Sequence, residues 1–150
     1  MPLAEAAIAA ALKQAGVTGS ELAAVIVAGP HGRANRRAAA AAGAKATALG
    51  DDLTGTVGNT GAAHAGLLLA DALDRAQADD LILVVSLADG CDVTIWKATA
   101  ALATHRQRVP VADQVKAGGK VAYATFLTWR GFLRREPPRR PDPQAPAAPP

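Results

Sequence analysis

Two runs of apolar residues constrain the fold more than any other feature of the chain. The first covers residues 22–28 (LAAVIVA) and is followed by a Gly-Pro pair, a pattern typical of a β-strand buried on both faces. The second covers residues 81–88 (LILVVSLA), and an Asp-Gly pair separates it from a third short stretch at residues 93–96 (VTIW). This second pattern predicts two strands joined by a tight turn, which is a β-hairpin.

Helical segments separate these strands. Residues 3–14 place apolar side chains at helical spacing, residues 33–42 are rich in alanine, and residues 60–78 begin with small residues and end amphipathic. The small residues at the start of the third helix predict that its first turns are buried against other backbone. The glycine-containing stretch 44–58 predicts a loop. This order of elements predicts an α/β fold in which helices pack on a mixed sheet.

Composition divides the chain into three parts. The 150 residues are 50% hydrophobic but only 3% aromatic, which predicts one domain whose core is filled by aliphatic side chains and close backbone contact. We expect residues 1–103 to form that domain. Residues 104–133 are expected to form an irregular extension that contains an aromatic segment. Residues 134–150, rich in proline and arginine, predict a disordered linker or tail.

Charge and motifs argue against several classes of protein. The formal net charge of +3 resides in residues 130–150, so the remainder is neutral and a nucleic-acid partner is not expected. No uncharged apolar run reaches the roughly 18 residues of a membrane helix. A single cysteine and the lack of a leader pattern predict a cytoplasmic protein. Nucleotide-binding glycine motifs and metal-ligand spacings are missing too, so neither a metal nor a cofactor is expected.

Asn59 is the first candidate site residue. It lies between Gly58 and Gly61 at the expected start of the third helix, in the sequence VGNTGAA. One interpretation is a helix cap that satisfies a free backbone amide, and on the residues alone this is the simpler one. The other is a catalytic amide that donates a hydrogen bond to a thioester carbonyl as negative charge develops on it. Gly58 and Gly61 would then let substrate and backbone approach closely.

Three histidines and one cysteine complete the candidates. His31 follows the first strand, where ligand sites of α/β sheets commonly lie, and is either a loop residue or a donor or general base. Cys91 is expected to be a small buried side chain rather than a nucleophile. His64 is expected to be a packed or capping side chain inside the third helix. His105 lies in the poorly patterned segment after the hairpin.

These motifs resemble a known family. The run GDDLTGTVGNTGAAHAGLLLADALDRAQADDLILVVSLADG resembles the C-terminal half of ketoacyl-carrier-protein synthase III and hydroxymethylglutaryl-CoA-synthase-like proteins, both of the thiolase superfamily. In that family a Gly-Asn motif opens a buried helix, and Asn59 matches the catalytic asparagine. The segment VIVAGPHGRANRR resembles the part that carries the catalytic histidine, usually as His-Gln-Ala-Asn, which implies that role for His31. The interval from His31 to Asn35 is one residue longer than in that arrangement.

The resemblance covers roughly residues 2–99 and implies a thiolase-like half-domain, half of a five-layered fold. It implies an acyltransferase of lipid metabolism that forms or cleaves carbon–carbon bonds on acyl-CoA or acyl-carrier-protein thioesters. The family's cysteine nucleophile lies on an N-terminal half that this sequence does not contain. The implied partner is therefore that half or a synthase subunit, in an oligomer, and activity is expected only with it.

The end of the chain carries a second resemblance. YATFLTWRGFLRREPPRRPDP resembles the junction by which some synthase-like domains join a zinc-ribbon and OB-fold module associated with acyl-CoA chemistry, which implies such a protein as a further partner. The missing nucleophile leaves an alternative open. The chain is then a non-catalytic scaffold or interaction subunit, or a truncated remnant, that retains the fold without the chemistry.

Overall fold

The computed structural model describes residues 2–134 and residue 136. Most of the predicted disordered tail, residues 134–150, therefore lies outside the described residues. The chain divides into two compact units, one that ends at Ala117 and one that begins at Gly118. Each is described by itself.

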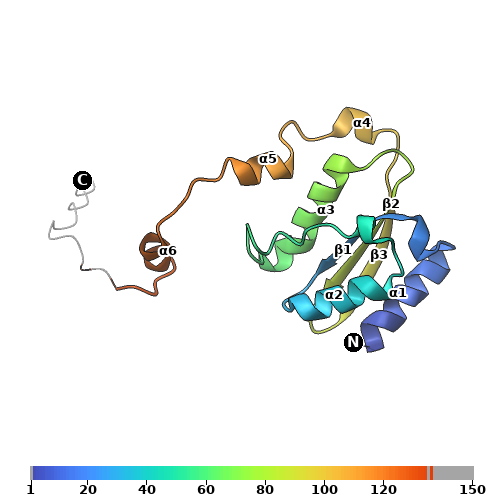
Figure 1. Ribbon diagram of the computed structural model, residues 1–150, viewed down its shortest axis with the longest axis horizontal. Coiled ribbons are helices and arrows are strands. Elements are labelled where there is room, and N and C mark those ends of the chain that lie inside the picture. Colours follow the sequence, from blue (N-terminus) through green and yellow to red (C-terminus); the bar gives the residue numbers. More distant parts are fainter. Residues whose placement is uncertain (1, 135, 137–150) are drawn as a thin grey trace, which may run out of the picture. The chain divides into compact units, whose positions relative to one another are not determined.

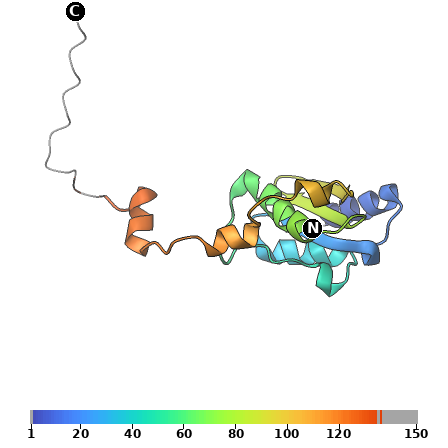
Figure 2. The ribbon, with the colours of Figure 1, turned by 90° about the horizontal axis from the view of Figure 1, so that it is seen from above.

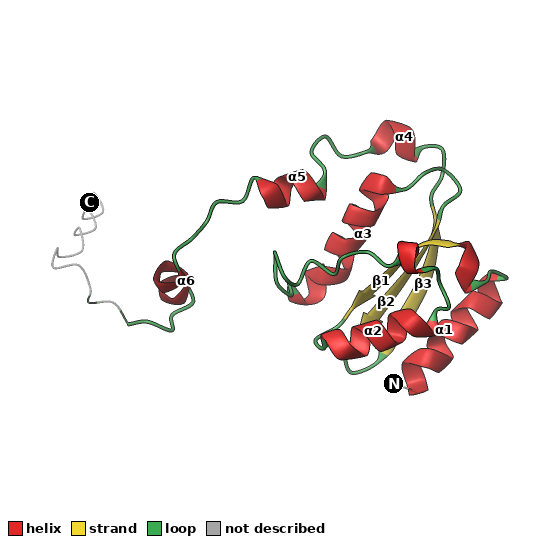
Figure 3. Ribbon diagram, viewed as in Figure 1, coloured by secondary structure: helices red, strands yellow, loops and turns green. Residues whose placement is uncertain are grey.

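A three-stranded mixed sheet forms the centre of the first unit (Figures 1 and 3). Its strands are β1 (Leu22–Ala28), β2 (Leu81–Leu87) and β3 (Cys91–Lys97). β1 and β2 are parallel, with Ile26 opposite Val84, and β2 and β3 form an antiparallel hairpin. Both predicted strand runs and the predicted hairpin are confirmed.

Helices cover both faces of this sheet and give three layers (Figure 2). On one face, α1 (Pro2–Ala15) and α2 (Gly32–Ala41) enclose a core cluster with alternate residues of β1 and β2. On the other face, α3 (His64–Arg75) packs against the intervening residues. Because successive side chains of a strand point to opposite faces, each of the two apolar runs supplies both clusters. The predicted α/β fold with helices on a mixed sheet is confirmed.

Small side chains allow these layers to approach closely. Ala38 and Ala42 of the second helical segment are 0% and 2% exposed. A Cβ atom built on Gly19 would lie 1.9 Å from the carbonyl oxygen of Ala42, so only glycine fits there. The hydrophobic side chains buried in the described residues are Ala, Val, Leu and Ile, as the scarcity of aromatic residues predicts.

The start of the third helix differs from the prediction. Residues 61–63 form a 3₁₀ turn, α3 begins only at His64, and residues 60–63 are exposed rather than buried. Gly61 has a φ of +65°, a left-handed conformation that interrupts a right-handed helix. The small residues in this stretch therefore reflect a tight, exposed turn and not a buried helix start.

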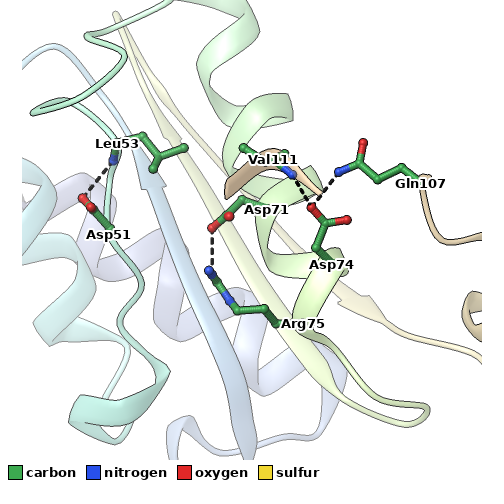
Figure 4. A network of polar contacts seen from close by, with 7 residues as sticks. All are labelled: Asp51, Leu53, Asp71, Asp74, Arg75, Gln107 and Val111. Carbon is green, nitrogen blue, oxygen red and sulfur yellow. Dashed lines mark hydrogen bonds and ion pairs between the residues drawn. The ribbon is translucent and has the colours of Figure 1, made fainter. Parts of the chain in front are cut away.

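The first unit extends beyond residue 103, where the sequence places the end of the domain. Two short helices, α4 (Leu102–His105) and α5 (Val111–Lys116), follow the hairpin. The Asp74 carboxylate on α3 accepts hydrogen bonds from the Val111 amide at 2.7 Å and from Gln107 at 2.6 Å (Figure 4). Val111 is buried in the α3 core cluster. The Arg106 guanidinium also donates to the carbonyls of Asp74 and Ala76. Individual side-chain contacts thus hold the segment, and they form no sequence pattern.

The second unit contains one helix, α6 (Tyr123–Trp129), among its described residues. The rings of Tyr123 and Phe126 stack with centroids 6.3 Å apart, and Tyr123, Trp129 and Phe132 are exposed. Across the described residues, each helix is too short or too polar to cross a bilayer.

Replacing Leu83 with alanine tests the central position of β2. Leu83 is 0% exposed and lies between two paired strands, so Leu83→Ala should lower the free energy of unfolding by about 2 to 5 kcal/mol in urea titrations. Leu3→Ala is the matched control because Leu3 is 67% exposed, and its effect should stay within about 0.5 kcal/mol. Equal losses for the two variants would contradict the assignment of the core.

Candidate functional site

The Asn59 side chain is fixed by two hydrogen bonds although the residue is exposed. Its Oδ1 accepts from the Gly61 amide at 2.8 Å, and its Nδ2 donates to the Gly29 carbonyl at 3.2 Å. The first bond closes an Asx turn that satisfies the Gly61 amide, so Asn59 does the work of a cap from the position before the N-cap residue, Thr60. The second bond links the turn to the end of β1, thirty residues away in the sequence.

The two glycines beside Asn59 are required by the backbone. Gly58 has a φ of +84° and Gly61 a φ of +65°, and a Cβ atom added to either would meet no atom within 4 Å. Their φ angles therefore account for the glycines. The space beside them is open, but their predicted contact with a substrate remains a prediction.

Gly29 is the junction of the site, and the sequence does not single it out. Its carbonyl accepts from Asn59 Nδ2 and from Asn35 Nδ2, both at 3.2 Å. A Cβ on Gly29 would lie 2.5 Å from Asn35 Oδ1 and 3.0 Å from Leu87 Cβ, so a larger residue would displace its neighbours. Asn35 is 5% exposed and belongs to α2. One carbonyl thus joins β1, α2 and the Asn59 turn.

A cavity of about 360 Å³ lies beside this junction. It is bounded by the ends of β1 and β2 and by the turn that leads into α3. Ligand sites in open α/β sheets commonly lie at the carboxyl ends of parallel strands, and this cavity has that position. Its lining consists of small or apolar residues with three polar side chains, those of Asn59, His64 and Ser86.

The two predicted catalytic residues have different surroundings. Asn59 lines the cavity, whereas His31 is exposed and is absent from its lining. His31 precedes α2 with an extended backbone, and its side chain makes no capping hydrogen bond. They are nevertheless close along the backbone. His31 lies two residues after Gly29, whose carbonyl accepts the hydrogen bond from Asn59.

Cys91 has the character of a packed side chain. It is the first residue of β3, is half-buried, and packs on the face of the sheet that α1 and α2 cover. Burial raises the pKa of the Cys91 thiol, and the neighbouring Asp92 charge raises it further. A thiol with a raised pKa is a poor nucleophile at neutral pH. This agrees with the expectation from the sequence.

A second cavity, of about 330 Å³, lies along β1 and α3. Asp71, whose side chain is 7% exposed, forms an ion pair with Arg75 at 2.8 Å beside it (Figure 4). Hydrogen bonds from the Thr54 hydroxyl and amide hold the pKa of Asp52, also in the lining, below its usual value. Within the described residues these carboxylates form no cluster suited to a metal ion. The sequence analysis did not single out this cavity.

Comparison with models of known protein families gave no match, and comparison with curated proteins gave none.

The accessibility and pKa of Cys91 predict slow alkylation. Because burial and the neighbouring Asp92 charge raise the pKa of the Cys91 thiol above its usual value, little of the reactive thiolate should be present at neutral pH. Iodoacetamide labelling followed by mass spectrometry should therefore be slow at pH 7 and become faster as the pH is raised. The same chain unfolded in urea is the control and should react faster at pH 8. Rapid labelling of the folded chain at neutral pH would show an activated thiol.

Proposed function

We propose that this chain is a thiolase-like half-domain that supplies Asn59 to an acyl-thioester site. The proposal rests on the hydrogen bonding of the Asn59 side-chain amide, which lines the cavity. A side-chain amide has two N–H donors, and one of them is bonded to Gly29. The second is available to a ligand carbonyl, while the two bonds to backbone hold the group in a fixed orientation. Preorganised donors of this kind stabilise developing negative charge.

The element order also supports a thiolase-like half. The Gly-Asn turn leads through a 3₁₀ turn into α3, and the hairpin of β2 and β3 follows, which is the order that the resemblance implies. In this proposal His31 acts as donor or general base at the edge of the site, beside the Gly29 junction. The substrate is an acyl-CoA or acyl-carrier-protein thioester, and the chemistry is condensation or cleavage at the acyl carbon.

A second polypeptide is part of the proposal because the described residues offer no activated nucleophile. Cys91 packs on the face of the sheet away from α3, and its pKa is raised. A cysteine on a partner, an N-terminal half or a synthase subunit, would carry the acyl group. On the α3 face of the sheet, α3 covers β1 and β2 but leaves β3 open. Trp96 of β3 is 52% exposed on this face, which supports a partner there. A zinc-ribbon and OB-fold protein is a further candidate partner.

One observation favours the alternative of a non-catalytic scaffold. Both polar ends of the Asn59 side chain are already bonded to backbone, as a structural cap requires. A scaffold would need Asn59 only to fix the turn. Ligand binding distinguishes the two functions, because the second amide proton of Asn59 has no role in the turn and would be needed only to bind a ligand.

The first test measures the contribution of the acyl group to binding. The chain should bind acetyl-CoA about fivefold to tenfold more tightly than CoA, the gain expected of one hydrogen bond. Asn59→Asp and Asn59→Ser should abolish that preference, since both residues can cap but neither has an amide donor. Isothermal titration of the two ligands gives the ratio, with CoA as the internal control for each variant. An unchanged preference in both variants would leave Asn59 as a cap.

The second test measures turnover. With a Cys-bearing N-terminal half supplied in trans, Asn59→Asp should lower the rate of acyl transfer by about 10²-fold or more, as loss of an oxyanion donor does. The melting temperature should fall only slightly, because the bond to Gly29 is lost while the cap to Gly61 is kept. Retained turnover at normal stability would rule out the catalytic assignment.

A further inference from the structure

His64 is an unusual residue in the segment that carries Asn59. It is the first residue of α3 and is 1% exposed. From residue 54 to residue 67 it is the sole buried residue. Between Leu53 and Leu68 the one fully buried side chain is thus an imidazole, which also lines the cavity at the end of β1. Ala65 and Leu67 are only partly buried against the core.

The hydrogen bonding of this imidazole is incomplete. Nδ1 lies 3.4 Å from the Thr60 hydroxyl, the long end of the range for a hydrogen bond. Nε2 has no partner among the described residues. Burying an unpaired polar atom costs free energy, and an apolar side chain of similar size would avoid that cost. The stability of the core alone does not explain why a histidine stands at this position.

The contact with Thr60 connects the imidazole to the turn that carries Asn59. Thr60 is the residue after Asn59, and both are exposed. The bonds of Asn59 to Gly29 and Gly61 join it to backbone. The contact between Thr60 and His64 ties the same turn to a side chain in the interior.

We propose that His64 is a positioning residue, which holds the turn through the Thr60 hydroxyl and so fixes the amide of Asn59 at the cavity. His64 acts through Thr60 and Asn59 and does not itself take part in the chemistry. The value of this arrangement for acyl binding rests on the proposed function of Asn59. The positioning itself can be measured without any ligand.

The experiment measures exchange of the Asn59 Nδ2 protons with solvent by NMR, with the resonances assigned by their loss in Asn59→Asp. Thr60→Val removes the hydroxyl from an exposed residue and keeps its shape. His64→Leu removes both ring nitrogens and keeps the bulk, while His64→Asn retains a polar atom near the position of Nδ1. His105→Asn, at an exposed histidine on α4, is the control.

In Thr60→Val and His64→Leu we expect the Asn59 amide protons to exchange about tenfold faster, as loss of one tethering hydrogen bond predicts. His64→Asn should recover much of the protection, and His105→Asn should match the original protein. The preference for acetyl-CoA over CoA should fall in parallel in the first two variants. Should His64→Leu fail to fold, Thr60→Val still decides, because Thr60 is exposed.

Unchanged exchange in Thr60→Val would overturn the positioning role of His64, whatever the binding data show. Absence of any preference for acetyl-CoA in the original protein would instead overturn the proposed function and leave the exchange result intact. The two failures are therefore distinguishable.

Discussion

The parallel pairing of β1 with β2 is the interaction on which the rest of the structure depends. It places residues 22–28 beside residues 81–87 in one direction, so both strands end at the same edge of the sheet. Parallel strands joined in this way need cover on both faces, and α1 and α2 on one side and α3 on the other provide it. The cavity that Asn59 lines opens where the two strands end. Its position is thus a consequence of the strand direction.

At that shared edge, the carbonyl of Gly29 brings together the residues of the candidate site. A backbone carbonyl has two lone pairs, and here each is directed to a side-chain amide, one from α2 and one from the Asn59 turn. Any residue larger than glycine would push against Asn35 and Leu87. The arrangement explains how an exposed asparagine obtains a fixed orientation without burial. Its rigidity comes from backbone partners on both sides.

The sequence predicted those parts of the fold that depend on repeated local patterns. The runs at residues 22–28 and 81–88 predicted the strands because a short run of mainly aliphatic residues is typical of a strand that is buried on both faces. The 3₁₀ turn before α3 escaped prediction because Gly61 determines it through one backbone angle, and small residues fit equally well in a buried helix. The attachment of residues 104–117 was not predicted for a similar reason, since Asp74, Arg106 and Val111 hold it through contacts of individual side chains. For the candidate site, the sequence predicted Asn59 but not Gly29 or Asn35, whose importance appears only when distant segments meet.

The distribution of unpaired polar atoms bears on the choice between an active half-site and a scaffold. Among the described side chains, the two buried polar atoms without a hydrogen-bond partner are Asn35 Oδ1 and His64 Nε2. Both belong to residues that share a partner or a cavity wall with Asn59. An apolar side chain in place of the His64 ring would avoid the cost of the unpaired Nε2, whereas Asn35 also donates through Nδ2 to the Gly29 carbonyl. The proposed acyl-thioester site would account for their concentration at the ends of β1 and β2, because in such a site polar geometry matters more than stability.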